Sequence, residues 1–534
     1  MSQLEPGRAP TTTRRSPSSW HPPERAVLLV PLALGLAMLL WRGPQLVDDA
    51  FITMRYSFHL AHGDGPVFNP GERVEGFSNP LWMLLLAAGS LVGLPLPQLA
   101  LVVGALAFLG VVVLTTRLAT LEDAGPVGAL IAGTVVALSG GLVGSSLNGL
   151  ETSLFTLGLT ATTLLAAQDP LPRGRFVAAL LVVAYSRPEG LPLALVIVAV
   201  TYLSRRRWSL DTRSLVPVAL GAVVVTIGTL LARWAYYGEL LPMSVIAKRD
   251  LDTGPLHSLA RSAPDGIRYL FEALGPGWLL LALVTGGYLV ARWRPPSGPV
   301  RVALTLTVVL GSIGTLVAVS NGGDWMPDGR LLVPYVPLVV AAMAAGLDTS
   351  TLPRGVLPAW AVLLVALQPH SWTNTWQPVH HEYDSVSTSL QEASGPDDTV
   401  TTNVLGHLGY ASPSLRLFDV HGLTEPSIAT QHLDADVYGK FDARLVAERA
   451  DPVIVMNSWR LLAQVVAETD TPYVGITSPT LEASNVFVAL RADAADRFTA
   501  SLSSSYELEV VAFDQAVAAW RRAAPYGQSA GGGP

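Results

Sequence analysis

Residues 98–116, QLALVVGALAFLGVVVLTT, form an apolar stretch of 19 residues without a charged side chain. A helix of about 20 such residues spans the hydrocarbon core of a bilayer, which is about 30 Å thick. Similar stretches recur between about residue 26 and about residue 369 of this 534-residue chain, of which only 14% is charged. Soluble domains contain roughly 25% charged residues. The sequence therefore excludes a purely soluble enzyme and predicts a polytopic α-helical membrane protein.

The distribution of arginine predicts the topology, because short loops rich in Arg and Lys stay in the cytoplasm. Arginines in short loops include the run 205–207 and residues 173, 175, 292, 294 and 301. Placing these loops inside predicts about eleven crossings, with the N-terminus in the cytoplasm, and a non-spanning helix at 80–92. The predicted spans are 26–41, 98–116, 127–145, 152–167, 176–186, 190–203, 215–235, 276–292, 301–320, 331–347 and 355–369.

The sequence predicts a disordered cytoplasmic tail (1–24), a transmembrane domain (25–369) with an outer loop at 42–97, an α/β domain (370–522) and a second disordered tail (523–534). In the 370–522 region, short β-type runs alternate with helical patterns, which predicts a largely parallel sheet outside the membrane. The chain has no cysteine, so neither disulfides nor thiolate metal sites are available. A net charge of −7 argues against a nucleic-acid partner.

The predicted topology sends every acidic or aromatic loop to the outer face of the membrane. The densest of these loops begins with Asp48 and Asp49 directly after the first span. Two adjacent carboxylates that are partly withdrawn from water repel each other, which raises at least one pKa and suits a general base or a cation site. The alternative is structural, with Asp48 or Asp49 as the N-cap of a helix over 50–60. Because Asp48 lies closer to that capping position, Asp49 is the preferred base.

Several motifs carry a resemblance to a known family. They are DDAFITMRY at 48–56, GDG at 63–65, VFNPGERVEGFSNPLW at 67–82, GLET at 149–152, RPEG at 187–190, YYGELLP at 236–242, GGDWMP at 322–327 and DVHGLT at 419–424. Together they resemble the GT-C glycosyltransferases, and most closely the actinobacterial terminal arabinofuranosyltransferases of cell-wall arabinan assembly. The resemblance covers about residues 47–425.

The resemblance implies that a sugar, expected to be arabinofuranose, moves from a polyprenyl-phosphate donor to a cell-envelope polysaccharide at the outer face of the plasma membrane. It also implies that a carboxylate of the first outer loop is the catalytic base. A donor phosphate requires a cationic contact, for which guanidinium groups are well suited. The candidates on the outer side are Arg187, Lys248, Arg249 and Arg330. Each of these could instead anchor the protein at the membrane interface or pair with Glu189 or Asp324.

A further set of outer residues is expected to contact the sugar or the acceptor, and Trp325 could stack on a sugar ring. The set is Glu151, Glu189, Asp324, Trp325, Arg55 and Tyr237. The outer carboxylates, with His62, could also supply ligands for Mg²⁺, Ca²⁺ or Mn²⁺, although no metal-binding spacing is present. The segment His380–Glu382 is interpreted as a solvated turn next to the membrane rather than as a metal site.

Two other functional classes are compatible with many spans and outer charges. A transporter or flippase for a lipid-linked glycan would show a two-fold repeat and charges near the bilayer midplane, and the sequence has no repeat. A non-catalytic scaffold would leave Asp48 and Asp49 without a role. Within the transferase class, a different sugar or a protein acceptor stays open.

Overall fold

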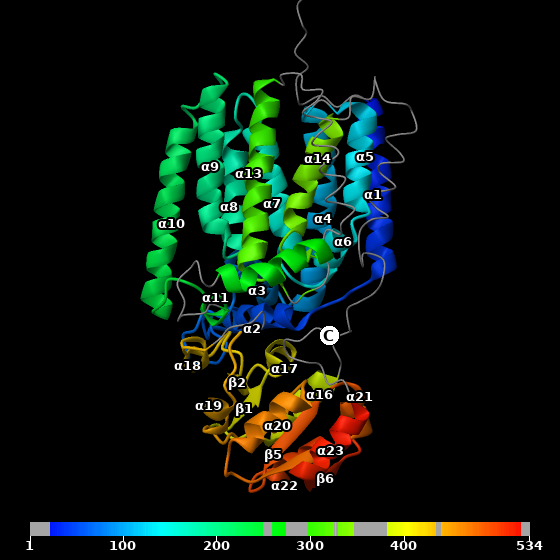
Figure 1. Cartoon of the computed structure of the whole chain (residues 1–534), viewed down its shortest axis with the longest axis vertical. Helices are drawn as coiled ribbons and strands as arrows, with labels where there is room; N and C mark the ends of the chain where they lie inside the picture. The colour runs from blue at the N-terminus through cyan, green and yellow to red at the C-terminus, as the bar shows by residue number, and fades with distance from the viewer. Residues whose placement is uncertain are drawn as a thin grey trace, which may run out of the picture.

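The computed structural model describes residues 22–122, 124–248, 259–273, 297–324, 326, 329–346, 382–433 and 439–524. These residues form two parts that are stacked along the long axis of the molecule, a bundle of long helices and a C-terminal domain built on a sheet (Figure 1). The predicted spans at 276–292 and 355–369, together with Arg249, Trp325, His380 and His381, lie outside the described residues.

The bundle contains the apolar helices predicted from the sequence. They are α1 (Pro22–Arg42), α4 (Leu96–Leu121), α5 (Gly125–Ala137), α6 (Gly140–Leu147), α7 (Thr152–Ala166), α8 (Arg173–Ser186), α9 (Gly190–Arg207), α10 (Leu215–Tyr237), α13 (Gly298–Ser320) and α14 (Val336–Gly346). In the described part of the chain, α4, α10 and α13 are each long and apolar enough to cross a membrane. The predicted span at 127–145 is broken, because α5 and α6 meet at 50°. The total of about eleven crossings stays a prediction.

Two helices of the loop predicted at 42–97 lie across the end of the bundle. They are α2 (Asp48–His62) and α3 (Pro80–Leu91), and the short helix α11 (Met243–Ala247) lies nearby (Figure 1). Proline is favoured in the first turn of a helix, where its missing N–H costs no hydrogen bond, and Pro80 begins α3. With 12 residues, α3 is about 18 Å long, which is too short to cross a bilayer. It is the helix predicted at 80–92.

The C-terminal domain contains six strands in the order β2-β1-β3-β5-β4-β6. The strands are β1 (Thr399–Thr402), β2 (Arg416–Asp419), β3 (Val453–Met456), β4 (Tyr473–Thr477), β5 (Phe487–Arg491) and β6 (Glu509–Ala512). Only β1–β2 and β1–β3 pair in parallel, and the other three pairings are antiparallel. The prediction of a largely parallel sheet was therefore wrong, because β4 was missed. Gly475 weakens the β pattern of that strand.

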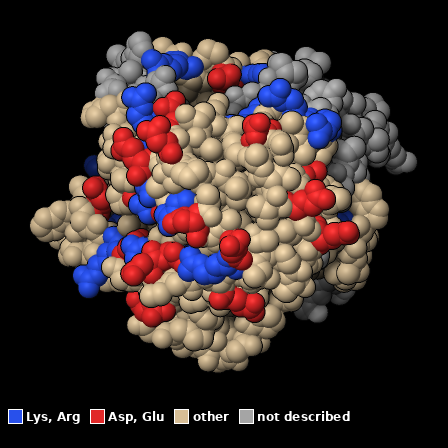
Figure 2. Space-filling view, turned by 90° about the horizontal axis from the view of Figure 1, so that it is seen from below, with Lys and Arg blue, Asp and Glu red and all other residues tan. Residues whose placement is uncertain are grey.

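Eight helices accompany this sheet. They are α16 (Glu382–Ala393), α17 (Leu405–Ala411), α18 (Pro426–Ala429), α19 (Ala443–Ala447), α20 (Trp459–Ala467), α21 (Pro479–Ala483), α22 (Ala495–Leu502) and α23 (Phe513–Ala523). Acidic and basic side chains are interspersed on the face of the domain that Figure 2 shows. This face therefore carries no large surface of a single sign.

The two parts of the molecule share a hydrophobic core at their junction. Ile52 and Tyr56 of α2 belong to the same buried cluster as Leu405 and Leu408 of α17. The helix α17 packs directly on α2. The helix α2 therefore lies between the bundle and the C-terminal domain and contacts both (Figure 1). The site is built around this helix.

Candidate active site

Asp48 and Asp49 occupy the first turn of α2. The N-cap residue is Val47, without a side-chain hydrogen bond, so neither aspartate caps its own helix as the sequence suggested. Asp48 instead accepts hydrogen bonds from the first turn of α17. Its Oδ2 lies 2.9 Å from the backbone nitrogen of Gly406, and its Oδ1 lies 2.8 Å from that of His407. The turn at 403–410, which superficially resembles a nucleotide-binding turn, therefore packs onto the membrane domain.

The Asp49 carboxylate is directed toward different partners. No hydrogen bond to it is found within the described parts of the chain. Burial raises its pKa above the ordinary value, and the positive charges of Lys248 and Arg330 partly oppose that shift. A carboxylate with a raised pKa and free acceptor oxygens has the properties of a general base. Of the adjacent pair, Asp49 is therefore the one available for chemistry.

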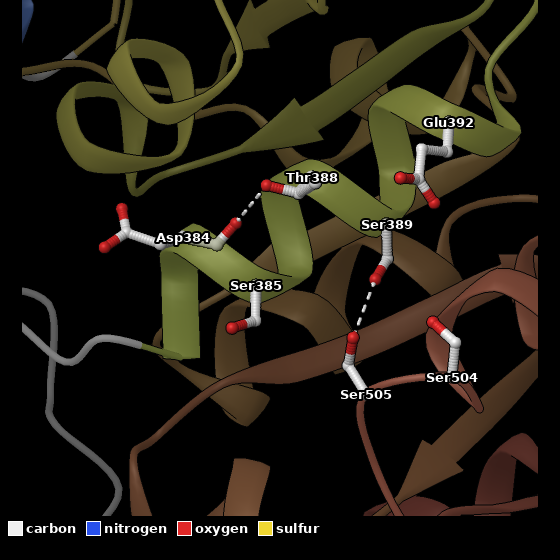
Figure 3. A pocket seen from close by; sticks show the side chains of 7 residues that line it. All are labelled: Asp384, Ser385, Thr388, Ser389, Glu392, Ser504 and Ser505. Atoms are coloured by element: carbon white, nitrogen blue, oxygen red, sulfur yellow. Dashed lines mark hydrogen bonds between the residues drawn. The ribbon is translucent and has the colours of Figure 1, made fainter.

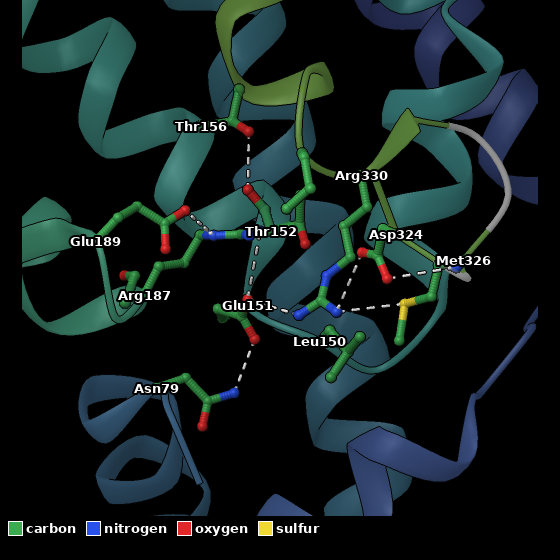
Figure 4. A network of polar contacts seen from close by, with 12 residues as sticks. Asn79, Leu150, Glu151, Thr152, Thr156, Arg187, Glu189, Asp324, Met326 and Arg330 are labelled. Carbon is green, nitrogen blue, oxygen red and sulfur yellow. Dashed lines mark hydrogen bonds and ion pairs between the residues drawn. The ribbon is translucent and has the colours of Figure 1, made fainter. Parts of the chain in front are cut away.

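A buried polar network is centred on Glu151 (Figure 4). The Oε2 atom of Glu151 accepts a hydrogen bond from Asn79 Nδ2 at 2.7 Å, and its Oε1 lies 3.2 Å from Arg330 Nη2 and 3.8 Å from Arg187 Nη1. Burial opposes ionisation, but Arg330, Arg187 and Asn79 together hold the pKa of Glu151 below its ordinary value. Glu151 is therefore the anion that holds two arginines in place.

Asn79 connects this network to the helix that carries the aspartates. Its Oδ1 accepts a hydrogen bond from Thr53 Oγ1 at 3.2 Å. Thr53 lies four residues after Asp49 and therefore on the same face of α2. No spacing in the sequence relates Asn79 to Glu151, which is 72 residues away, so this contact could not be predicted.

The two arginines have hydrogen-bonding capacity that no described residue uses. Arg187 Nε donates to Glu189 Oε1 at 2.6 Å, and Arg330 Nη1 lies 3.8 Å from Asp324 Oδ2. Arg187 Nη1 and Arg330 Nε are buried and have no hydrogen-bond partner among the described residues. An unsatisfied buried N–H costs free energy, which an anionic ligand would recover. Residues from separate segments of the chain, Glu151, Arg187 and Arg330, thus meet in this network.

Arg55 does not take part in this network. Its side chain is fully buried, and its guanidinium donates to the carbonyl oxygens of Phe68 (2.8 Å), Gly409 (2.8 Å) and Leu415 (2.6 Å). The group joins the first outer loop to the C-terminal domain. The expectation that Arg55 contacts the sugar or the acceptor is therefore not supported by its position.

Two other predicted residues lie elsewhere. His62 is at the far end of α2, about 20 Å along the helix from Asp49, and its Nδ1 lies 2.8 Å from the Phe58 carbonyl oxygen. The Tyr237 hydroxyl donates to the Pro66 carbonyl oxygen at 3.1 Å, so it supports the outer loop. Lys248 follows α11 and is near enough to Asp49 to affect its pKa.

The carboxylates do not form a metal site in the described residues. No group of three or more His, Asp or Glu side chains is arranged there to hold an ion. Glu151 and Glu189 already neutralise arginines, which makes them poor ligands for a second cation. The residues present therefore do not fit the divalent cation considered from the sequence.

A polar pocket lies in the C-terminal domain, between α16 and residues 504–505 (Figure 3). It encloses about 270 Å³, and its lining residues are Asp384, Ser385, Thr388, Ser389, Glu392, Ser504 and Ser505. Several of these hydroxyls already serve the domain itself. Thr388 donates to the Asp384 carbonyl oxygen at 2.9 Å, and the Oγ atoms of Ser389 and Ser505 are 3.5 Å apart. No sequence motif marked this pocket.

The overall arrangement is similar to that of a solved structure. The chain superposes on ArnT from Cupriavidus metallidurans, solved with undecaprenyl phosphate bound, with a TM-score of 0.54 at 16% identity. The match covers 88% of this chain and 98% of ArnT. The chain has a GT-C fold. It is accordingly a multi-pass membrane protein, and the expected fold class, with its C-terminal sheet domain, is confirmed.

Sequence comparison identifies relatives of this chain. It is 25% identical over 393 residues to a terminal β-(1→2)-arabinofuranosyltransferase of Corynebacterium glutamicum, a match that covers 64% of this chain and 55% of the relative. It is 30% identical over 359 residues to a protein of the same name from Mycobacterium tuberculosis. This match covers 59% of this chain and 54% of the relative. The matches thus span about half the length of these relatives. Residues 373–508 match a family described as a domain of unknown function, DUF8728.

Proposed function

We propose that this protein is a membrane glycosyltransferase that transfers arabinofuranose from a polyprenyl-phosphate donor to a cell-envelope glycan. The observation that carries the proposal is the position of Asp49. Its carboxylate has no hydrogen bond among the described residues, the positive charges of Lys248 and Arg330 act on it, and Arg330 belongs to a network in which two arginine N–H groups have no partner in the described part of the chain. The relatives named arabinofuranosyltransferases support the choice of sugar.

In the proposed reaction, an acceptor hydroxyl oxygen attacks the anomeric carbon of the donor. Asp49 takes the hydroxyl proton, a new C–O bond forms, and the bond from the anomeric carbon to the phosphate oxygen breaks. The polyprenyl phosphate leaves with the bonding electrons and gains negative charge. Arg187, Arg330 and Lys248 are the cations that would stabilise this charge, which is the part of the reaction where fixed positive groups contribute most.

The proposal places this site at the outer face of the plasma membrane. Arg205 to Arg207 end α9, at the opposite end of that helix from the Arg187 loop. With these arginines in the cytoplasm, Asp49, Asp324 and the C-terminal domain are outside. A reporter fused after Leu367 should therefore score as extracytoplasmic, and a cytoplasmic result would contradict this orientation.

The direct test is a transfer assay with purified protein. A panel of polyprenyl-phosphate sugars is incubated with a synthetic arabinan acceptor, and the product linkage is determined. We expect product from the arabinofuranose donor. Transfer of another sugar from the panel would keep the reaction class but reject the substrate. Movement of intact donor across a vesicle membrane without any product would favour the flippase alternative.

A further inference from the structure

The contact between Asp48 and α17 is closer than ordinary packing between domains. A Cβ atom at position 406 would overlap the backbone carbonyl oxygen of Asp48, so only glycine allows this approach. The ring of His407 lies 4.4 Å from that of Phe51, centroid to centroid, and its Nε2 is 3.0 Å from Asp384 Oδ1. The backbone contact at Gly406 and the ring contact between His407 and Phe51 thus hold the start of α2 against α17, and the Asp384 pair holds His407 within the C-terminal domain.

The Asp48 carboxylate caps the N-terminus of α17, which has no capping side chain of its own. The N-cap residue of α17 is Val404, whose side chain cannot accept a hydrogen bond, and the first backbone N–H groups of a helix have no partner within it. Asp48 accepts from two of these groups with separate oxygens. Both of its oxygens are therefore engaged by the C-terminal domain, whereas those of Asp49 are not.

We infer that Asp48 is a positioning residue, and that its contact with Gly406 and His407 fixes the first turn of α2 and thereby the orientation of Asp49. This inference rests on the proposed role of Asp49 as the base. Successive side chains on a helix point about 100° apart, so holding one carboxylate toward α17 directs the next away from it. The C-terminal domain would then complete the active site, although it contributes no reacting group.

The contact itself can be tested without turnover. Hydrogen–deuterium exchange is measured in the segment 405–411 of the full-length protein, wild type and two variants. We expect Asp48→Asn to accelerate exchange in this segment, because a neutral amide cannot accept both hydrogen bonds with charge assistance. Asp49→Asn is the matched control and should leave the exchange unchanged. Equal exchange in wild type and Asp48→Asn would overturn the inference, even if the proposed reaction is correct.

The catalytic consequence is tested with a double-mutant cycle. Asp48→Asn and Gly406→Ala should each lower kcat by roughly 10- to 100-fold with little change in donor binding, since small displacements of a reacting group have effects of this size. Because both substitutions disrupt the same contact, kcat of the double variant should be little lower than kcat of either single variant. Gly311→Ala, where an added Cβ meets no atom within 4 Å, is the control for the substitution.

The pH profile separates positioning from catalysis. If Asp48 only positions Asp49, the Asp48→Asn variant keeps the acidic limb of its kcat/KM profile. Loss of that limb in Asp48→Asn would make Asp48 itself the base. Additive effects of Asp48→Asn and Gly406→Ala, or loss of donor binding in either, would also overturn the inference. If wild-type protein transfers no sugar at all, the proposed function fails, while the exchange experiment still decides the contact.

Discussion

The charged side chains on the two faces of α2 differ in how completely they are hydrogen-bonded. On the face toward the C-terminal domain, Asp48 and Arg55 are saturated by backbone groups, Asp48 by two N–H donors and Arg55 by carbonyl acceptors. On the face toward the bundle, Asp49 has no hydrogen bond within the described chain, and neighbouring arginines keep unused donors. Charges whose hydrogen bonds are complete hold parts of the protein together, and charges whose hydrogen bonds are incomplete are free to act on a ligand.

The largest effect is expected from a substitution of Asp49, on the face of α2 toward the bundle. Asp49→Asn should lower kcat by roughly 10²- to 10⁴-fold, the usual contribution of a general base, and leave binding of the lipid donor intact. Turnover at saturating donor and donor binding are measured in parallel. Normal turnover of this variant would place the base elsewhere, with Asp324 or Glu151 as the next candidates.

A substitution on the face of α2 toward the C-terminal domain should lower the stability of the protein rather than its turnover. Arg55→Met leaves the buried carbonyls of Gly409 and Leu415 without their donor, at a cost of about 2–4 kcal/mol in the docking of the two parts. A lower midpoint of thermal unfolding and easier proteolysis between the two parts are expected. If the midpoint is unchanged while donor affinity falls, Arg55 belongs with the ligand-binding residues as the sequence first suggested.

A smaller effect should follow from removing one cation of the network. Arg187→Gln or Arg330→Gln should weaken donor binding by roughly 10- to 100-fold, because a charge-assisted hydrogen bond in a poorly hydrated site contributes about 1.5–3 kcal/mol. Acceptor binding should change much less. Arg268→Gln removes an exposed arginine that pairs with Glu272 at 2.7 Å and serves as the control. Equal weakening for donor and acceptor would argue against phosphate contact.

The smallest change in activity near neutral pH is expected from shifts in the pKa of Asp49. A base must be ionised, so activity falls as the pH drops through its pKa in the folded protein. Burial raises that pKa, and the acidic limb of the kcat/KM profile should therefore lie above the ordinary aspartate value of 3.8. Arg330→Gln removes a charge that favours the ionised form and should move the limb further upward. A downward shift would show that Arg330 does not act on Asp49.

The sequence predicted the apolar helices and most of the network, and it missed the contacts between distant segments. Arg187 and Glu189 are two residues apart, so their pairing is a local property that the sequence displays. Asp48 and Gly406 are separated by 358 residues, and no periodicity relates them. The role of Asp48 was misjudged for this reason, because an aspartate at a helix start normally caps its own helix.

The unequal lengths of the bundle helices also bear on the lipid around the protein. The 14 residues of α8 extend about 21 Å, whereas the 23 residues of α10 extend about 35 Å, and the hydrocarbon core between them is about 30 Å thick. Hydrophobic mismatch of this size makes a bilayer thin beside the short helix and thicken beside the long one. Arg187 follows α8, so a bilayer that thins beside this short helix would bring its headgroups toward the arginine.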